Sequence, residues 1–156
     1  RIHFIELSTE RNDKVDTCCQ VYKTELLKKC EFPNYHEEFM PESVLWNKID
    51  QTYKITEINK VIYMREYQAD GYTKSGRKKN VNSPLGSMES NRYLLNAKIP
   101  FCQKIKANLL FSCYGLIAKK NISQLVDEST NKMFTILCMP VALCIAAIWS
   151  KKWKSD

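Results

Sequence analysis

Glycine and histidine are both scarce in this sequence, and each shortage excludes a class of protein. The 156 residues include four glycines and two histidines. So few glycines rule out a collagen-like or glycine-rich repeat protein and a glycine-loop enzyme. His3 and His36 stand in different segments away from the cysteines, and no C-x-x-C pair occurs. The sequence therefore predicts no cofactor, no metal site and no catalytic residue, and we expect a protein that is not an enzyme.

Acidic residues are scarce in the second half of the chain. Residues 1–69 hold 10 basic and 12 acidic side chains, whereas residues 70–156 hold 14 basic and five acidic ones. Such an imbalance indicates an anionic partner, either nucleic acid or lipid headgroups. Few aromatic residues lie between the charges, which argues against nucleic acid and favours anionic lipid headgroups. We expect the contacts to come from Arg77, Lys78, Lys79, Lys151, Lys152 and Lys154.

One long run has no charged side chain. Residues 133–149 read MFTILCMPVALCIAAIW, and as a helix they rise about 25 Å, the short edge of what crosses a ~30 Å hydrocarbon core. Trp149, Trp153 and the flanking lysines suit the headgroup layer. The sequence predicts a transmembrane helix at 132–150 and a basic tail at 151–156. The alternative is the central helix of a soluble bundle, because a helix that is apolar on every side has to be buried.

Lysines after the run predict an orientation. Three follow it closely, and only Lys132 lies just before it. The positive-inside rule then places the tail in the cytosol or matrix and residues 1–131 on the other side. Lys152 and Lys154, at the fifth and third positions from the end, resemble the dilysine retrieval signal of endoplasmic reticulum membrane proteins. We therefore expect the endoplasmic reticulum membrane, with the mitochondrial inner membrane as the alternative.

Four of the seven cysteines have a regular spacing. Cys19 and Cys30 are 11 residues apart, as are Cys102 and Cys113, and 11 residues return a helix to nearly the same face. Two antiparallel helices would then allow the disulfides Cys19–Cys113 and Cys30–Cys102, which need an oxidising compartment. The spacing is similar to that of the paired-cysteine helical hairpins of the mitochondrial intermembrane space. The alternative is reduced, half-buried cysteines in a cytosolic bundle.

Periodic apolar positions predict a mainly α protein with about four helices. The first runs from Ser8 or Thr9 to about Glu31, and the second covers about 43–68. A third follows Pro100, and the apolar run is the last. Residues 70–92 hold three of the four glycines and four serines beside a basic cluster, which is typical of a flexible loop. Residues 1–131 would form one helical, disulfide-bearing domain.

Asn121, Ile122 and Ser123 form an N-glycosylation triplet, which is modified only if residues 1–131 are lumenal. Together these features predict a non-enzymatic single-span membrane protein that acts as an accessory or interaction subunit of a larger membrane complex. Its partners would be other membrane-protein subunits and anionic lipid headgroups. The alternative is a soluble helical binding module whose C-terminal helix forms the core and whose basic loop and tail contact an acidic partner.

Overall fold

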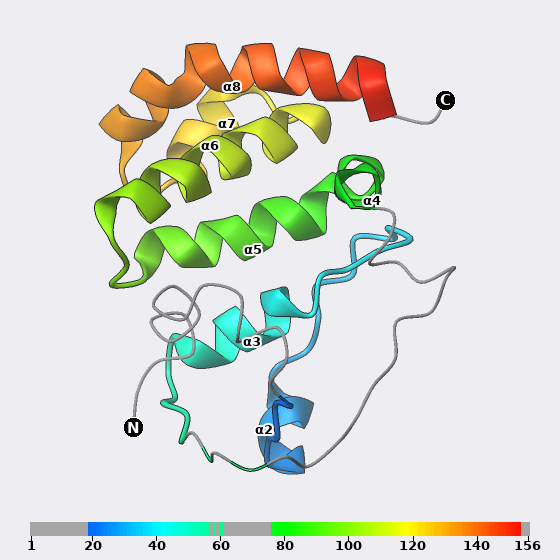
Figure 1. Cartoon of the computed structure of the whole chain (residues 1–156), viewed down its shortest axis with the longest axis vertical. Helices are drawn as coiled ribbons and strands as arrows, with labels where there is room; N and C mark the ends of the chain where they lie inside the picture. The colour runs from blue at the N-terminus through cyan, green and yellow to red at the C-terminus, as the bar shows by residue number, and fades with distance from the viewer. Residues whose placement is uncertain (1–18, 57, 59, 61–75, 154–156) are drawn as a thin grey trace.

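The computed structural model describes residues 19–56, 58, 60 and 76–153 (Figure 1). These residues form seven helices and no strand, which confirms a mainly α fold. In chain order the helices are α2 (Thr24–Lys29), α3 (Ser43–Asp50), α4 (Arg77–Asn82), α5 (Pro84–Asn96), α6 (Phe101–Ile117), α7 (Ile122–Glu128) and α8 (Lys132–Trp153).

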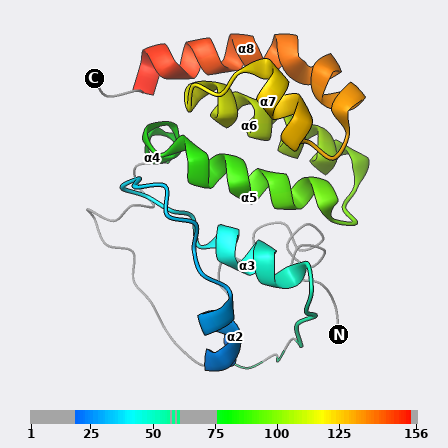
Figure 2. The same ribbon diagram turned by 180° about the vertical axis from the view of Figure 1, so that it is seen from behind.

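The helices α5, α6 and α8 lie in layers, with α6 in the middle (Figures 1 and 2). α5 and α6 run in opposite directions and are joined by the short connection 97–100. α7 carries the chain back, so α8 runs in the same direction as α6. The ring of Phe101 accordingly lies 5.9 Å from that of Phe134 at one end, and the ring of Tyr114 lies 5.7 Å from that of Trp149 towards the other.

α6 is the central helix because its second half is enclosed by its neighbours. Every residue from Phe111 to Gly115 is buried, and Met88, Leu125 and Met139 bring apolar side chains to the same core from α5, α7 and α8. The helix that the apolar spacing predicts after Pro100 is thereby confirmed. α8, which the alternative prediction places at the core, contributes Met139 and Ala146 to this cluster but lies in an outer layer (Figure 1).

The predicted loop at 70–92 is wrong over its described part, because residues 77–82 and 84–96 are the helices α4 and α5. Pro84 stands in the first turn of α5, where its missing N–H costs nothing. The carboxylate of Glu37 accepts hydrogen bonds from the N–H groups of Leu85 (2.8 Å) and Gly86 (3.0 Å) and so caps the helix. The small residues of α5 lie on its buried face and let α3 and the chain before it approach closely.

The N-terminal helices are shorter than predicted. Residues 19–23 are not helical, and α2 covers six residues rather than a helix that ends at about Glu31. α3 ends at Asp50, and the β-branched and aromatic residues at 52–56 that follow it have low helix propensity. The rest of both predictions, at 8–18 and at 61–68, lies outside the described residues.

Candidate functional site

α8 exposes a continuous apolar surface, which we call the outer face. Within 133–148, every exposed side chain of the helix is apolar. The exposed fraction reaches 83% for Met133, 76% for Leu137 and 63% for Ile148. The face extends about 24 Å along the helix. It consists of Met133, Ile136, Leu137, Pro140, Val141, Leu143, Cys144, Ala147 and Ile148.

The opposite side of α8, which we call the inner face, packs on α6. It consists of the buried residues Thr135, Cys138, Met139, Ala142 and Ala146. Ala142 and Ala146 have short side chains, which let the two helices approach closely. Among the described residues, α8 is the one helix long and apolar enough to cross a membrane, yet only 28% of its most apolar 18-residue stretch is buried. The structure therefore covers one side of the predicted span and leaves the other bare.

A small polar network fixes the inner face at the start of α8. The Nδ2 atom of Asn108 donates a hydrogen bond to the Oγ1 atom of Thr135 at 3.0 Å, and the hydroxyls of Thr135 and Ser129 share a hydrogen bond of 2.6 Å. All three side chains are buried. Asn131 caps the helix, because its Oδ1 atom accepts a hydrogen bond from the N–H of Phe134 at 3.1 Å. Thr135 carries the only hydroxyl of the apolar run, and this hydroxyl points inward.

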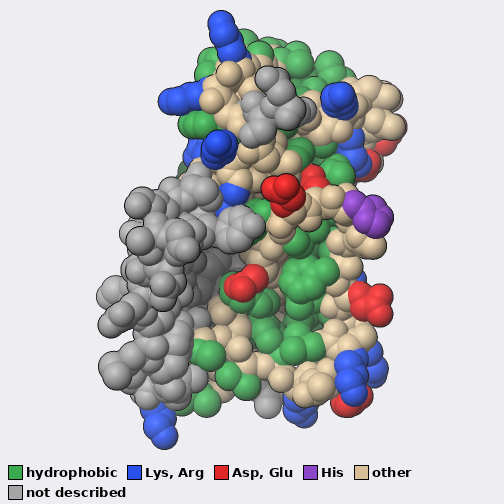
Figure 3. All heavy atoms as spheres, turned by 90° about the vertical axis from the view of Figure 1, so that its right-hand side faces the viewer, with side chains coloured by type: hydrophobic (Ala, Val, Ile, Leu, Met, Phe, Trp, Pro, Cys, Tyr) green, Lys and Arg blue, Asp and Glu red, His purple; other side chains and the backbone are tan. Residues whose placement is uncertain are grey.

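Basic and aromatic side chains gather at the other end of α8. The guanidinium of Arg77 stacks 4.2 Å from the centre of the Trp149 ring, and this ring lies 5.9 Å from the ring of Trp153. Lys151 and Lys152 are exposed beside them. Figure 3 looks onto this end of the molecule and shows Lys and Arg side chains around its upper part, among apolar ones. α4 supplies Arg77, so residues far apart in the sequence share one surface.

Of the six residues predicted to contact anions, Arg77 and Lys152 lie at the end of α8, Arg77 on the ring of Trp149 and the Lys152 ammonium 5.0 Å from the centre of the Trp153 ring. Lys78 and Lys151 are exposed and adjoin these two residues in the sequence. Lys79 stands apart from them because its ammonium group lies 4.5 Å above the ring of Phe39. Lys154 lies outside the described residues. These basic residues are evident in the sequence, but the sequence does not predict that α4 packs against α8.

The predicted disulfides do not occur in the structure. Cys19, Cys30, Cys102 and Cys113 are all free. The two-helix geometry fails on one side, since Cys19 precedes α2 and Cys30 follows its last residue. Cys113 is fully buried in the core, whereas Cys19 is exposed. Burial raises the pKa of the Cys113 thiol to about 12, so this thiol is a poor nucleophile.

Asn121, the predicted glycosylation residue, is exposed at the start of α7. Its Oδ1 atom accepts a hydrogen bond from the N–H of Gln124 at 2.8 Å, and the Gln124 side chain accepts one from the Asn121 N–H at 3.0 Å. This reciprocal pair is a capping box. Asn121 therefore has a structural role in α7, and its glycosylation stays a prediction.

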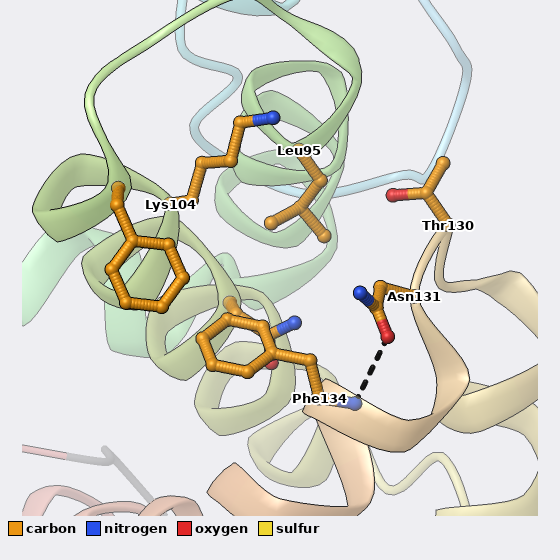
Figure 4. Close-up of a pocket in the computed structure, with 7 residues that line it drawn as sticks. Leu95, Lys104, Thr130, Asn131 and Phe134 are labelled. Atoms are coloured by element: carbon orange, nitrogen blue, oxygen red, sulfur yellow. Dashed lines mark hydrogen bonds between the residues drawn. The ribbon is translucent and has the colours of Figure 1, made fainter.

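A pocket of about 290 Å³ lies where α6 and α8 begin (Figure 4). Its polar lining residues are Lys104, Asn108, Thr130 and Asn131, and its apolar wall consists of a leucine and two phenylalanines. The described residues contain no cluster of His, Cys, Asp and Glu that would hold a metal ion. The pocket is lined by Leu95, Phe101, Lys104, Asn108, Thr130, Asn131 and Phe134.

No protein family model, curated protein or solved structure matches this chain. The outer face of α8 and the basic cluster at its end are therefore the features on which a functional argument rests. The apolar run is evident in the sequence, but the sequence gives only a weak indication of which side of the helix packs against the protein. That indication is the recurrence of Thr135, Ala142 and Ala146 at helical spacing, which favours close helix packing on one side.

Proposed function

We propose that this protein is a non-enzymatic, membrane-attached protein in which α8 is the attachment element, and that it serves as an accessory or interaction subunit of a larger membrane complex. The observation that carries the proposal is the outer face, an unbroken apolar surface on a helix whose other side is already packed. Large apolar patches on a folded surface mark sites that contact a membrane or another protein.

The energetic reason is the area of the outer face. Burying one large aliphatic side chain completely contributes about 1.5–3 kcal/mol. Ile136, Leu137 and Val141 are each more than half exposed, as are Met133 and Ile148. Removing these five side chains from water supports a stable attachment even if each is only partly buried. Other membrane-protein subunits and lipid are the partners that such a surface fits.

The compartment is part of the proposal. We favour the endoplasmic reticulum membrane because Asn121, which belongs to an N-glycosylation triplet, is exposed, with the mitochondrial inner membrane as the alternative. The disulfide argument for an oxidising compartment has no support from the free cysteines. Removal of N-glycans from the protein isolated from its own cells tests the first choice, since a mobility shift that disappears in Asn121→Gln requires a lumenal Asn121.

Vesicle flotation tests the attachment. The full chain is mixed with phosphatidylcholine vesicles and centrifuged through a density gradient, and we expect it to float. The double variant Leu137→Asn, Ile148→Asn is expected to bind at least tenfold less, because two exposed apolar side chains become polar without a change in charge. Val21→Asn is the matched control, since Val21 is 80% exposed but lies away from α8. Equal flotation of all three proteins would contradict the proposal.

A soluble binding module is the second candidate, and the same outer face favours it because such a patch also fits a partner protein. The basic cluster would then contact an acidic part of that partner. This candidate predicts that the chain stays in the soluble fraction with vesicles and after alkaline carbonate treatment of membranes. Flotation with pure lipid would exclude it as the main function.

A further inference from the structure

We infer that α8 lies parallel to the membrane surface within one leaflet, with the outer face at the headgroup–acyl boundary and with Arg77, Lys78, Lys151 and Lys152 bound to anionic phospholipid headgroups. This inference rests on the proposed membrane attachment and names its geometry and its lipid. It differs from the transmembrane arrangement that the sequence predicts at 132–150.

The inner face is the first reason. A helix that crosses the bilayer alone is surrounded by lipid, so Thr135 would lose Asn108 and Ser129, to which it is hydrogen-bonded. Asn108 and Ser129 would then be left without this partner at the surface of α6 and the start of α8. A helix that lies in the surface plane keeps every one of these contacts.

The neighbours of α8 are the second reason. If α8 crossed the membrane with α6 and α5 still attached, polar groups of those helices would enter the hydrocarbon. These groups include the ion pair of Glu89 and Arg92 on α5 and the side chains of Lys104 and Lys106 on α6. Charged groups are rare at this depth because removing them from water is costly. With α8 parallel to the surface, α5 and α6 remain on the aqueous side of it (Figures 1 and 2).

The one-sided exposure of α8 is the third reason. Its sequence is apolar on all sides, but the packed inner face makes the folded layer apolar on one side only. A helix that presents an apolar face along its whole length, next to basic groups, is typical of proteins that lie in the membrane interface. The outer face is apolar from Met133 to Ile148, and two lysines, Lys151 and Lys152, follow it in the last turn of α8.

The distribution of basic side chains favours anionic lipid at the C-terminal end of α8. Lys132, at the opposite end, is paired with Asp127 at 2.8 Å. Within the described residues, Arg77, Lys78, Lys151 and Lys152 form no ion pair with an acidic side chain. Trp149 and Trp153 lie among them, and tryptophan is enriched at the level of the headgroups. The cluster thus combines interfacial aromatic rings with basic side chains that are not in ion pairs with any acidic residue in the described part of the chain.

Depth measurements on the full chain distinguish the two arrangements. The exposed cysteines are replaced by serine, and Met133→Cys, Val141→Cys or Ile148→Cys is then labelled with a fluorophore in separate proteins. Nitroxide lipids of known depth quench the label in vesicles. We expect similar, shallow depths for all three positions. If α8 crosses the bilayer, position 141 will lie near the midplane and about 11–12 Å deeper than the other two, which overturns the inference.

A charge-neutral variant tests the lipid. Binding is compared on phosphatidylcholine vesicles and on vesicles with about one-third phosphatidylserine. We expect Lys151→Gln, Lys152→Gln to lose about tenfold or more of the affinity for the anionic vesicles and to keep wild-type binding to the neutral ones. Lys28→Gln, Lys29→Gln on α2 makes the same change in charge elsewhere and should have little effect. Equal losses in both variants would refute the headgroup site, whereas absence of binding to any vesicle would refute the proposed function instead.

Discussion

Asn108 and Thr135 are joined by a buried hydrogen bond of 3.0 Å that connects the central helix α6 to α8. Thr135 is the one hydroxyl residue in an otherwise apolar run, so the position of this bond fixes which side of α8 faces the protein. Ser129 bonds to the same hydroxyl at 2.6 Å and connects the chain just before α8 to the network. The orientation of the outer face follows from these three side chains.

Thr135→Val is expected to lower the free energy of unfolding by about 1–3 kcal/mol, because the Asn108 amide would stay buried without its acceptor. Urea denaturation followed by circular dichroism measures the effect. Thr130→Val is the control, since Thr130 is exposed, and should change stability by less than about 0.5 kcal/mol. Equal stabilities of the two variants would show that α8 is not packed on α6 in solution.

Glu37→Ala is expected to cost about 1–2 kcal/mol, because the first N–H groups of α5 would lose the carboxylate that caps them at 2.8 and 3.0 Å. Thermal unfolding measures the loss. Glu38→Ala removes the adjacent, exposed carboxylate and should leave the melting temperature nearly unchanged. If Glu38→Ala is as destabilising as Glu37→Ala, then net charge rather than capping is responsible.

Gly115→Ala is expected to destabilise the core by about 1–3 kcal/mol. The added Cβ would collide with the Cδ2 atom of Leu125, which is fully buried, and would also lie 3.2 Å from the Sδ atom of Met88. The test is a double-mutant cycle with Leu125→Ala. The two substitutions together should be less costly than the sum of their separate costs, because the smaller residue removes the collision. Simple additivity would contradict the contact.

The buried thiol of Cys113 predicts a loss of stability at alkaline pH. Its pKa rises from an ordinary value of 9.0 to about 12 on folding, so between these values the folded state binds more protons than the unfolded state. Stability from this group is therefore complete below about pH 9 and falls as the pH rises towards 12, by at most about 1.4 kcal/mol per pH unit.

Urea midpoints at a series of alkaline pH values test this prediction by comparison of variants. Cys113→Ala should flatten the pH dependence relative to wild type, whereas Cys144→Ala should not, because Cys144 is exposed. Lysine and tyrosine titration contributes equally to all three proteins and cancels in the comparison. The same slope in wild type and Cys113→Ala would show that the thiol is not responsible.

The parts of the fold that depend on local pattern could be predicted from the sequence. α6 has apolar residues at steps of three and four, and α8 is an uninterrupted apolar run, so both appear close to their predicted positions. α5 could not be predicted in this way, because its buried face consists largely of small residues such as Gly86, Ser87 and Ser90, which resemble a loop in composition. Its cap, Glu37, comes from 48 residues earlier in the chain and leaves no local signal.

The candidate site was predictable only in part for the same reason. The apolar run and the lysines after it are evident in the sequence. Whether lipid or protein covers each side of α8 depends on Asn108, which lies 27 residues before Thr135. The position of Arg77 on Trp149 depends on α4, and α4 could not be predicted because residues 70–92 have the composition of a loop. The two predicted disulfides were wrong because the equal spacing of Cys19–Cys30 and Cys102–Cys113 does not require both intervals to be helical.

The arrangement of α5, α6 and α8 also has a consequence for the order in which the chain folds. These helices are neighbours or near neighbours in sequence and are joined by short segments, so little chain entropy opposes their meeting. Contacts between nearby segments form rapidly, whereas the Glu37 cap and the packing of α3 on α5 require the closure of loops of more than 40 residues. We expect the layer with the outer face to assemble before the N-terminal segments dock on α5, so that a partly folded full-length chain already carries the complete apolar surface.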